Sequence, residues 1–372
     1  MLRGQETENS FAVYWSTSYF PALDGLRAIC VALVICFHMH EKVPGFIHGS
    51  TGVDIFFVLS GFLITTLLLR EKEKYSSVSL KGFYVRRAFR ILPIYYIVLL
   101  MYFPAIWLLR DATRWHQLMC ALPYLLTFTQ EFLPKSAGSI FAHSWSLGYE
   151  EKFYLLWPLL VLMLHPFRRR NIMILLAIGA VILFLPWMAA RSYGGLFVGS
   201  ALGIVLDRSC RNRLQPYLLR IPSWVALGLV VAAYFLLFEQ NLPIQFFSAA
   251  VALLVAALVL RQSMVRRFLE HPLLVLPGKR SYAMYLVHVL VLNIMAVAAA
   301  KARVDFWFVV MPATYVGSFL VATVLFHLVE KPSVEFGRGL SRKLRKRLTE
   351  SLPRAAPLGA VRIRPIENPV DL

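Results

Sequence analysis

Apolar stretches close to 20 residues long recur along this chain, and each is long enough to cross a bilayer as a helix. We expect about ten such spans, which predicts an all-α, polytopic membrane protein. The composition agrees, because 58% of the residues are hydrophobic and only 16% are charged. The predicted spans are residues 22–39, 51–70, 90–109, 145–164, 172–190, 193–207, 222–239, 245–261, 280–300 and 306–329. Residues 118–130 are also apolar, but Pro123 and their short length favour an interfacial or re-entrant segment.

Lysine and arginine gather in alternate loops between these stretches. They follow the second span (REKEKYSSVSLKGFYVRRAFR), the fourth (RRR at 168–170), the sixth (DRSCRNRLQPYLLR), the eighth and the tenth (RGLSRKLRKR). Loops that stay in the cytoplasm carry such an excess, so ten spans would place both termini there. We expect a multi-pass protein of the plasma (inner) membrane. The net charge of +19 then reflects topology and lipid contact rather than nucleic-acid binding.

Both ends of the chain are predicted to lie in the cytoplasm, and the C-terminal tail shows no obvious chemistry. Residues 1–21 begin with a polar stretch that lacks the pattern of a secretory signal, so we expect a cytoplasmic N-terminal segment without cleavage. Residues 22–337 would form the membrane domain. Residues 338–372 would form a basic cytoplasmic tail, either solvated or bound to lipid headgroups.

The four cysteines form no CxxC pair, so neither a disulfide framework nor a metal site is expected.

The first span, DGLRAICVALVICFH, carries ionisable groups at both ends. Eleven helical steps place Arg27 and His38 about 20° apart on one face and about 16 Å apart along the axis. The predicted topology puts Arg27 toward the cytoplasm and His38 toward the outer side. Alternatively, Arg27 pairs with Asp24 three positions earlier or reaches the lipid headgroups, and His38 is an interfacial residue.

Two acidic residues lie inside predicted spans, where a charge is costly and indicates a functional site. A short loop makes the first two spans antiparallel, so Asp54 is expected at the depth of His38. A carboxylate beside an imidazole suits a general base, although Asp54 could instead cap its own helix. In HSWSLGYEEKFYLLWP, Ser146 and Glu150 share a face at i,i+4. We also expect Glu150 at the depth of His38, around a water-filled cavity.

An arginine cluster, Arg86, Arg87 and Arg90, precedes the third span. Arg86 and Arg90 share a helix face, and paired guanidinium groups suit bidentate recognition of phosphate. The cluster therefore predicts a phosphorylated ligand that arrives from the cytoplasm, unless it only fixes topology.

Weaker signals come from three further positions and from two small residues. Tyr285 and His288 in SYAMYLVHVLVLN either line the cavity or pack through hydrogen bonds. Arg191, expected in an outer loop, could bind a sugar, a carboxylate or headgroups. Ser60 and Gly61 are expected to permit close helix packing.

Five ordered motifs resemble the acyltransferase 3 family of integral membrane acyltransferases. They are LDGLRAICVALVICFH, GVDIFFVLSGFLIT, FYVRRAFRILPIYY, WSLGYEEKFYLLWP and SYAMYLVH, and they extend over about residues 20–336. The resemblance implies a ten-helix core that uses acyl-CoA, commonly acetyl-CoA, to O-acylate carbohydrates outside the cytoplasm. Tyr149 departs from the small aliphatic residue typical of the family before the glutamate pair.

By position in these motifs, the resemblance implies that His38 is the catalytic histidine and Arg27 its motif partner. It also implies that the arginine cluster meets the phosphates of CoA, while Asp54 and Glu150 match family positions. Many family members carry an additional soluble SGNH-type domain. We therefore expect this chain to act alone or with a separate partner protein.

These observations together predict an acetyl-CoA-dependent O-acetyltransferase of a glycan such as O-antigen or exopolysaccharide, without a metal. Its expected site residues are His38, Asp54 and Glu150 for catalysis, Arg27, Arg86, Arg87 and Arg90 for the donor, and Ser146, Arg191, Tyr285 and His288 for the acceptor. Succinyl remains an alternative acyl group, and an acyl-enzyme intermediate ranks behind direct transfer. A polysaccharide flippase or proton-coupled transporter is the alternative function, disfavoured by the arginine cluster and by the lack of a visible internal repeat.

Overall fold

The structure is a computed structural model that describes residues 10–39, 44, 46–134, 140–164, 187–208, 215–240, 243–303 and 307–351. Within these ranges the chain is all-helical and contains no strand. Most of the predicted span 172–190, the RRR cluster at 168–170 and the last part of the basic tail lie outside the described residues.

Helices occupy the other predicted spans. They are α2 (Pro21–His38), α3 (Thr51–Tyr75), α4 (Leu80–Leu109), α6 (Trp145–Leu164), α8 (Trp187–Val205), α10 (Ser223–Glu239), α11 (Ile244–Leu260), α14 (Ser281–Lys301) and α15 (Trp307–Leu325). Among the described residues, five helical segments are long and apolar enough to cross a bilayer: α2, α3, α4, α14 and the continuous segment 307–347 that begins with α15. The chain is therefore a helical membrane protein, while the total of ten spans and the side of the termini remain predictions.

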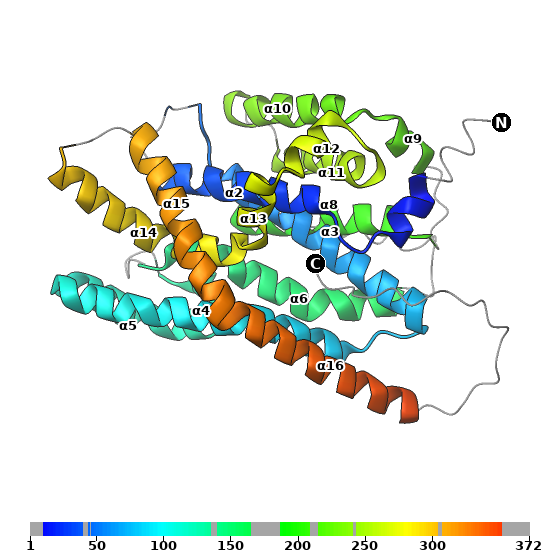
Figure 1. Cartoon of the computed structure of the whole chain (residues 1–372), viewed down its shortest axis with the longest axis horizontal. Coiled ribbons are helices and arrows are strands. Elements are labelled where there is room, and N and C mark those ends of the chain that lie inside the picture. The colour runs from blue at the N-terminus through cyan, green and yellow to red at the C-terminus, as the bar shows by residue number, and fades with distance from the viewer. Residues whose placement is uncertain are drawn as a thin grey trace.

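Shorter helices connect or cover these segments. The stretch predicted to be interfacial or re-entrant forms α5 (Ala112–Leu126), which lies along α4. Two short helices, α12 (Met264–Leu269) and α13 (Pro272–Lys279), precede α14, and α9 (Gln215–Arg220) precedes α10. Figure 1 shows α10 and α11 on one side of α2, α3 and α8, and α4, α5 and α6 on the other.

The helix α3 is the centre of the packing. It contacts α8 most extensively and also packs against α2, α6 and α11. Gly61 of α3 faces α8 so closely that a Cβ there would lie 1.9 Å from the backbone oxygen of Leu196. Gly199 of α8 makes the reciprocal contact, since its Cβ would lie 2.0 Å from the oxygen of Val58. The prediction that Gly61 permits close helix packing is confirmed.

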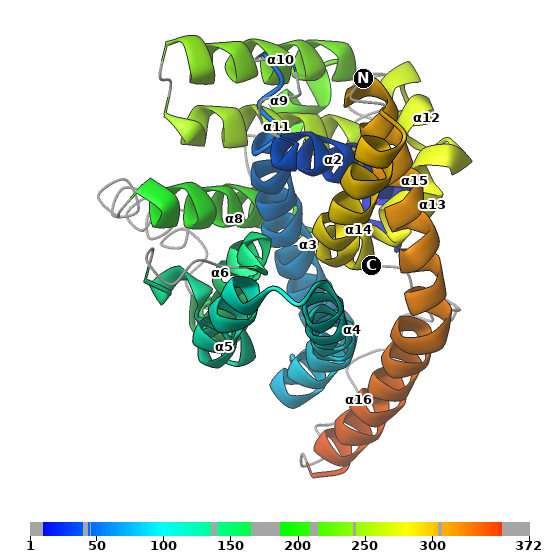
Figure 2. The ribbon, with the colours of Figure 1, turned by 90° about the vertical axis from the view of Figure 1, so that its left-hand side faces the viewer.

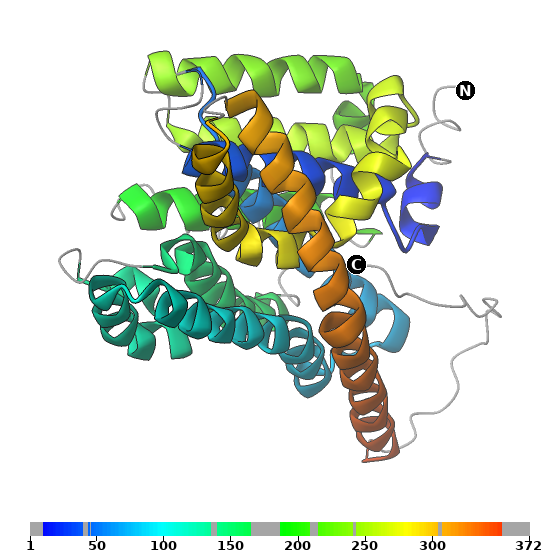
Figure 3. The same cartoon turned by 60° about the vertical axis from the view of Figure 1, so that its left-hand side comes forward.

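The last helical segment turns the end of the chain back along α4. After α15, a π-helical turn (Phe326–Glu330) leads directly into α16 (Lys331–Ser351). Figures 1 and 3 show α16 extending past the end of α4, with which it makes many contacts. Glu71 joins the two helices, because it pairs with Arg86 of α4 and with Arg345 of α16.

Candidate functional site

A cavity lies between α2, α3, α4, α6, α13 and α14. It contains about 930 Å³ of space between atoms, including its open mouth. Three of these helices run in the same direction past it: α2 from Arg27 to His38, α4 from Arg90 onward, and α14 from Ser281 to His288. In Figure 2, α14 lies beside α2.

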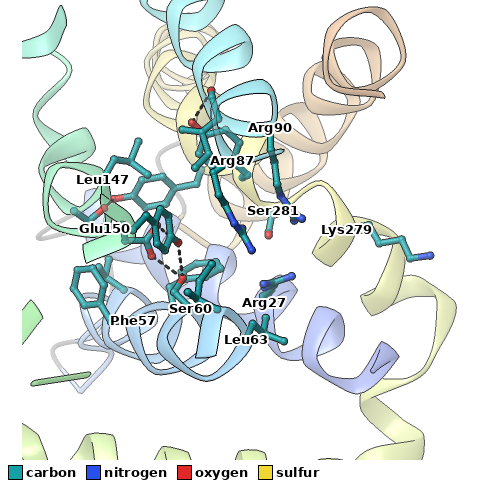
Figure 4. A pocket seen from close by; sticks show the side chains of 18 residues that line it. Arg27, Phe57, Ser60, Leu63, Arg87, Arg90, Leu147, Glu150, Lys279 and Ser281 are labelled. Carbon is teal, nitrogen blue, oxygen red and sulfur yellow. Dashed lines mark hydrogen bonds between the residues drawn. The ribbon is translucent and has the colours of Figure 1, made fainter. Parts of the chain in front are cut away.

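Cations define one end of the cavity. Arg87 and Arg90 extend from α4 toward Arg27 on α2, while Lys279 lies at the exposed rim (Figure 4). The guanidinium of Arg87 also lies 5.5 Å from the ring centre of Tyr154, which holds it against the wall. Several cations around one opening attract a polyanion such as a phosphorylated ligand.

Arg27 pairs with Asp24, as the alternative interpretation of the first span predicted. Its NH1 donates to Oδ1 of Asp24 at 3.1 Å, and the same carboxylate accepts a bond from Tyr19 at 2.7 Å. Arg27 nevertheless lines the cavity, so the ion pair positions the guanidinium there instead of removing it from the site.

The third arginine of the predicted cluster does not line the cavity. Arg86 donates to Glu71 at 2.6 Å and to the hydroxyl of Ser341 in α16 at 2.6 Å. The predicted i,i+4 pair of Arg86 and Arg90 is therefore wrong as a common site. The two arginines of this cluster that line the cavity are Arg87 and Arg90, at i,i+3 on α4.

Glu150 lies on the wall of the cavity, closer to the cations than predicted. Its carboxylate accepts hydrogen bonds from Ser60 at 2.8 Å and from Tyr154 at 3.2 Å, as Figure 4 shows in part. On α3, Gly52 lies against Cys30 and Val34 of α2, and Ser60 follows Gly52 by eight residues, or about 12 Å along the axis. The expectation that Glu150 shares the depth of His38 is wrong, since α6 carries it past the histidine level toward Arg87.

The other end of the cavity is closed by Tyr285 and Ser146. Their hydroxyl oxygens are 2.7 Å apart, and the Tyr285 hydroxyl donates to the carbonyl of His143 at 2.5 Å. Ser146 must therefore be the donor in the bond between the two hydroxyls. Tyr285 thus both lines the cavity and makes hydrogen bonds, which combines the two roles predicted as alternatives.

Three histidines gather directly behind this closure. The ring centres of His38 and His288 are 4.8 Å apart, and that of His143 is 4.9 Å from His288. His288 is fully buried and His143 nearly so. Burial lowers the pKa of His143, which lies in the turn η4 (Ala142–Ser144) outside the long helices, to about 3, with a smaller effect from nearby His38. No set of side chains in the described ranges, this cluster included, has the arrangement of a metal site.

Asp54 does not contact His38. Its carboxylate is 1% exposed and forms a bidentate ion pair with Arg191, with distances of 2.7 Å to Nε and 2.5 Å to NH2. Arg191 had been expected in a loop, but α8 begins at Trp187 and brings it inside the helix layer. The ion pair connects α3 to α8 away from the cavity lining. The prediction that Asp54 orients His38 is therefore wrong. Arg191 binds a carboxylate, one of the three alternatives predicted for it, and this carboxylate is that of Asp54.

Sequence reasoning missed several residues of this site. His143 is the first residue of the motif HSWSLGYEEKFYLLWP, just before α6. It lies on a different element from His38, so no helical spacing relates the two. Ser60 was interpreted only as a small packing residue, although it is the donor to Glu150. Lys279 and Tyr154 were not singled out, and they enter the cavity only because α13 and α6 pack beside α2 and α4.

The family model described as an acyltransferase domain (acyltransferase 3) matches residues 20–326. Among curated proteins, the chain is 28% identical to the peptidoglycan O-acetyltransferase OatA of Listeria monocytogenes, over 86% of this chain and 56% of that protein. It is 30% identical to the O-acetyltransferase OatA of Staphylococcus aureus, over 74% of this chain and 51% of that protein. The chain thus spans about half the length of the curated relatives it matches, and no solved structure matches it significantly.

Proposed function

Because the chain belongs to the acyltransferase 3 family, we propose that it is a membrane-bound O-acyltransferase that moves an acyl group from acyl-CoA to a hydroxyl of a glycan. We propose acetyl as the acyl group and a peptidoglycan-like glycan as the first acceptor to test, on the basis of the printed names of its relatives. The transporter alternative is not favoured by this membership.

One observation carries the proposal: a single cavity joins a cationic mouth to the layer that covers His38. Arg27, Arg87, Arg90 and Lys279 can meet the phosphates of the donor. The apolar walls between them and Tyr285 suit the narrow pantetheine arm, which carries the thioester. In the proposed orientation, the cations face the cytoplasm and His38 faces the outer side. The acyl group then crosses most of the bilayer while the nucleotide remains at the mouth.

The contact of His38 Nδ1 with the backbone supports Nε2 as the basic nitrogen. Nδ1 lies 2.9 Å from the carbonyl oxygen of Val34, and a carbonyl can only accept, so Nδ1 carries the hydrogen. Nε2 then carries the basic lone pair. In the proposed step, Nε2 removes the proton of a hydroxyl of the acceptor while the oxygen of that hydroxyl attacks the carbonyl carbon of the thioester. The carbon–sulfur bond breaks, and His38 returns the proton to the sulfur.

The Tyr285–Ser146 hydrogen bond separates the cavity from His38 in this structure. We propose that this contact opens when the acyl group advances, since only two hydroxyls have to part.

As a general base, His38 would contribute about 10²–10⁴-fold to the rate.

The test compares cells that carry the wild type, a deletion and His38→Ala, with mass spectrometry of their glycans. Loss of one ester species in both the deletion and His38→Ala supports the proposal. His116→Ala is the matched control, because His116 is exposed on α5 away from the cavity. Unchanged esters in all strains, together with no consumption of acetyl-CoA by the purified full-length protein, would refute it.

A further inference from the structure

The side chain of His288 contacts the imidazole of His38. Its Nε2 lies 3.2 Å from Nδ1 of His38, and its Nδ1 lies 2.5 Å from the carbonyl oxygen of Tyr285. It is 0% exposed, on the part of α14 that packs against α2. Asp54 and Glu150, the carboxylates expected beside the base, are bound elsewhere, to Arg191 and to Ser60.

The carbonyl contacts determine the protonation pattern of this pair. Because the Tyr285 carbonyl can only accept, His288 carries its hydrogen on Nδ1, and its Nε2 is an acceptor. The Nδ1 hydrogen of His38 faces both that acceptor and the Val34 carbonyl. Both acceptors therefore favour the same tautomer, with the basic lone pair of His38 on Nε2.

His143 completes the surroundings of the pair without competing for the same bond. Its Nε2 lies 3.1 Å from the carbonyl oxygen of Leu286, so it donates there. The hydroxyl of Tyr285 is also engaged, with His143 and Ser146. His288 is thus held by its own backbone contact and has its second nitrogen directed at His38.

We propose that His288 is a positioning residue of the catalytic base: it reinforces the tautomer that the Val34 carbonyl favours, fixes the ring orientation of His38 and stabilises the imidazolium that forms during transfer. This role differs from contact with the acceptor, which the sequence predicted for His288. It rests on the proposed acyltransferase function. When His38 takes up the hydroxyl proton on Nε2, its Nδ1 hydrogen becomes a stronger donor, and the bond to His288 strengthens as charge develops. No proton needs to leave the pair, because His38 returns it to the departing sulfur.

Two amide variants separate this role from packing. In His288→Gln, the side-chain oxygen can occupy the place of Nε2 and accept from His38. In His288→Asn, the shorter amide can occupy only the place of Nδ1, near the Tyr285 carbonyl. His288→Leu removes both polar atoms. We expect kcat to fall about 10–100-fold in His288→Leu and His288→Asn, a share of the contribution of the base, and to recover largely in His288→Gln. The KM for acetyl-CoA should change less than about threefold, because His288 does not line the cavity.

The assay measures thiol release from acetyl-CoA by the purified full-length protein, with soluble peptidoglycan glycan strands as acceptor. Thermal melting and size-exclusion profiles identify variants that fail to fold. A kcat of His288→Leu within twofold of wild type overturns the inference. So does a folded His288→Gln that is as slow as His288→Asn, since packing alone would then explain the loss.

A second arm tests whether His288 acts through His38. In a His38→Gln background, His288→Leu should leave the residual rate unchanged within about twofold, because the interaction is already lost. A further tenfold fall there would assign His288 an independent role and overturn the inference. If wild type releases no thiol at all, the proposed function fails, which is a different outcome from any contrast between variants.

Discussion

Replacing Asp54 by asparagine tests whether this carboxylate serves the base or connects two helices. Its ion pair with Arg191 is bidentate, and the two side chains are 1% and 9% exposed. Removing one member of such a buried pair costs about 3–5 kcal/mol. Asparagine retains one acceptor oxygen, so we expect about 3 kcal/mol, or about a 100-fold shift in the unfolding equilibrium.

The double variant Asp54→Leu with Arg191→Met provides the matched comparison. An apolar pair of similar volume often replaces a buried ion pair without loss, so we expect stability within about 1 kcal/mol of wild type. Unfolding in mixed micelles of increasing SDS content measures all three proteins. In the fraction that is folded, kcat should stay within about threefold of wild type, because the pair is outside the cavity and does not contact His38.

The opposite pattern would refute this interpretation. If Asp54→Asn is as stable as wild type but its kcat falls by 100-fold or more, the carboxylate acts on the base. The assignment made from sequence spacing would then be correct, and the ion pair would be incidental.

Two further substitutions test the cavity and the central packing. The double variant Arg87→Ala with Arg90→Ala should raise the KM for acetyl-CoA about 10²–10⁴-fold, since each of the two lost charged hydrogen bonds contributes about 1.5–3 kcal/mol. Lys81→Ala, which removes an exposed cation of the same helix, should leave the KM unchanged. Equal KM values for the two variants would mean that the arginine cluster only fixes topology. Gly61→Ala should lower the free energy of unfolding by at least about 1–3 kcal/mol through overpacking, measured as a lower SDS content at the unfolding midpoint. Gly228→Ala should not, because a Cβ at Gly228 would have no atom within 4 Å. Equal midpoints for the two variants would contradict the close α3–α8 contact.

The helices were largely predictable because they depend on local information. Apolar length alone located α2 and α6 within one residue of the observed ends. The main errors concern extension by polar residues, since α4 begins ten residues before the apolar stretch and includes the arginine cluster. Hydropathy cannot detect a helix that continues beyond the apolar region. Helical spacing placed Arg86 and Arg90 on one face, but which face of α4 meets the cavity depends on the neighbouring helices.

The site was predictable only in the features that one helix determines. The spacing of Arg27 and His38 placed both on α2, and Arg27 lines the cavity. Partners on other helices depend on tilt and axial shift, which a single sequence does not contain. Glu150 was therefore placed at the wrong depth, and the contact between His38 and His288, which are 250 positions apart, was not foreseen.

The ionisable residues of the membrane helices form two groups, according to which helix supplies the partner of each. Asp54 is neutralised by α8, which does not line the cavity, so its charge is used within the packing. Glu150 is held by neutral hydroxyl groups of α3 and α6 and keeps its carboxylate on the cavity wall. A counter-charge from outside the cavity thus indicates a structural role, whereas neutral donors leave a group available to a ligand. His38 also has neutral partners, because the His288 imidazole and the Val34 carbonyl accept from its Nδ1. By the same reasoning it belongs with the groups that can act on a ligand.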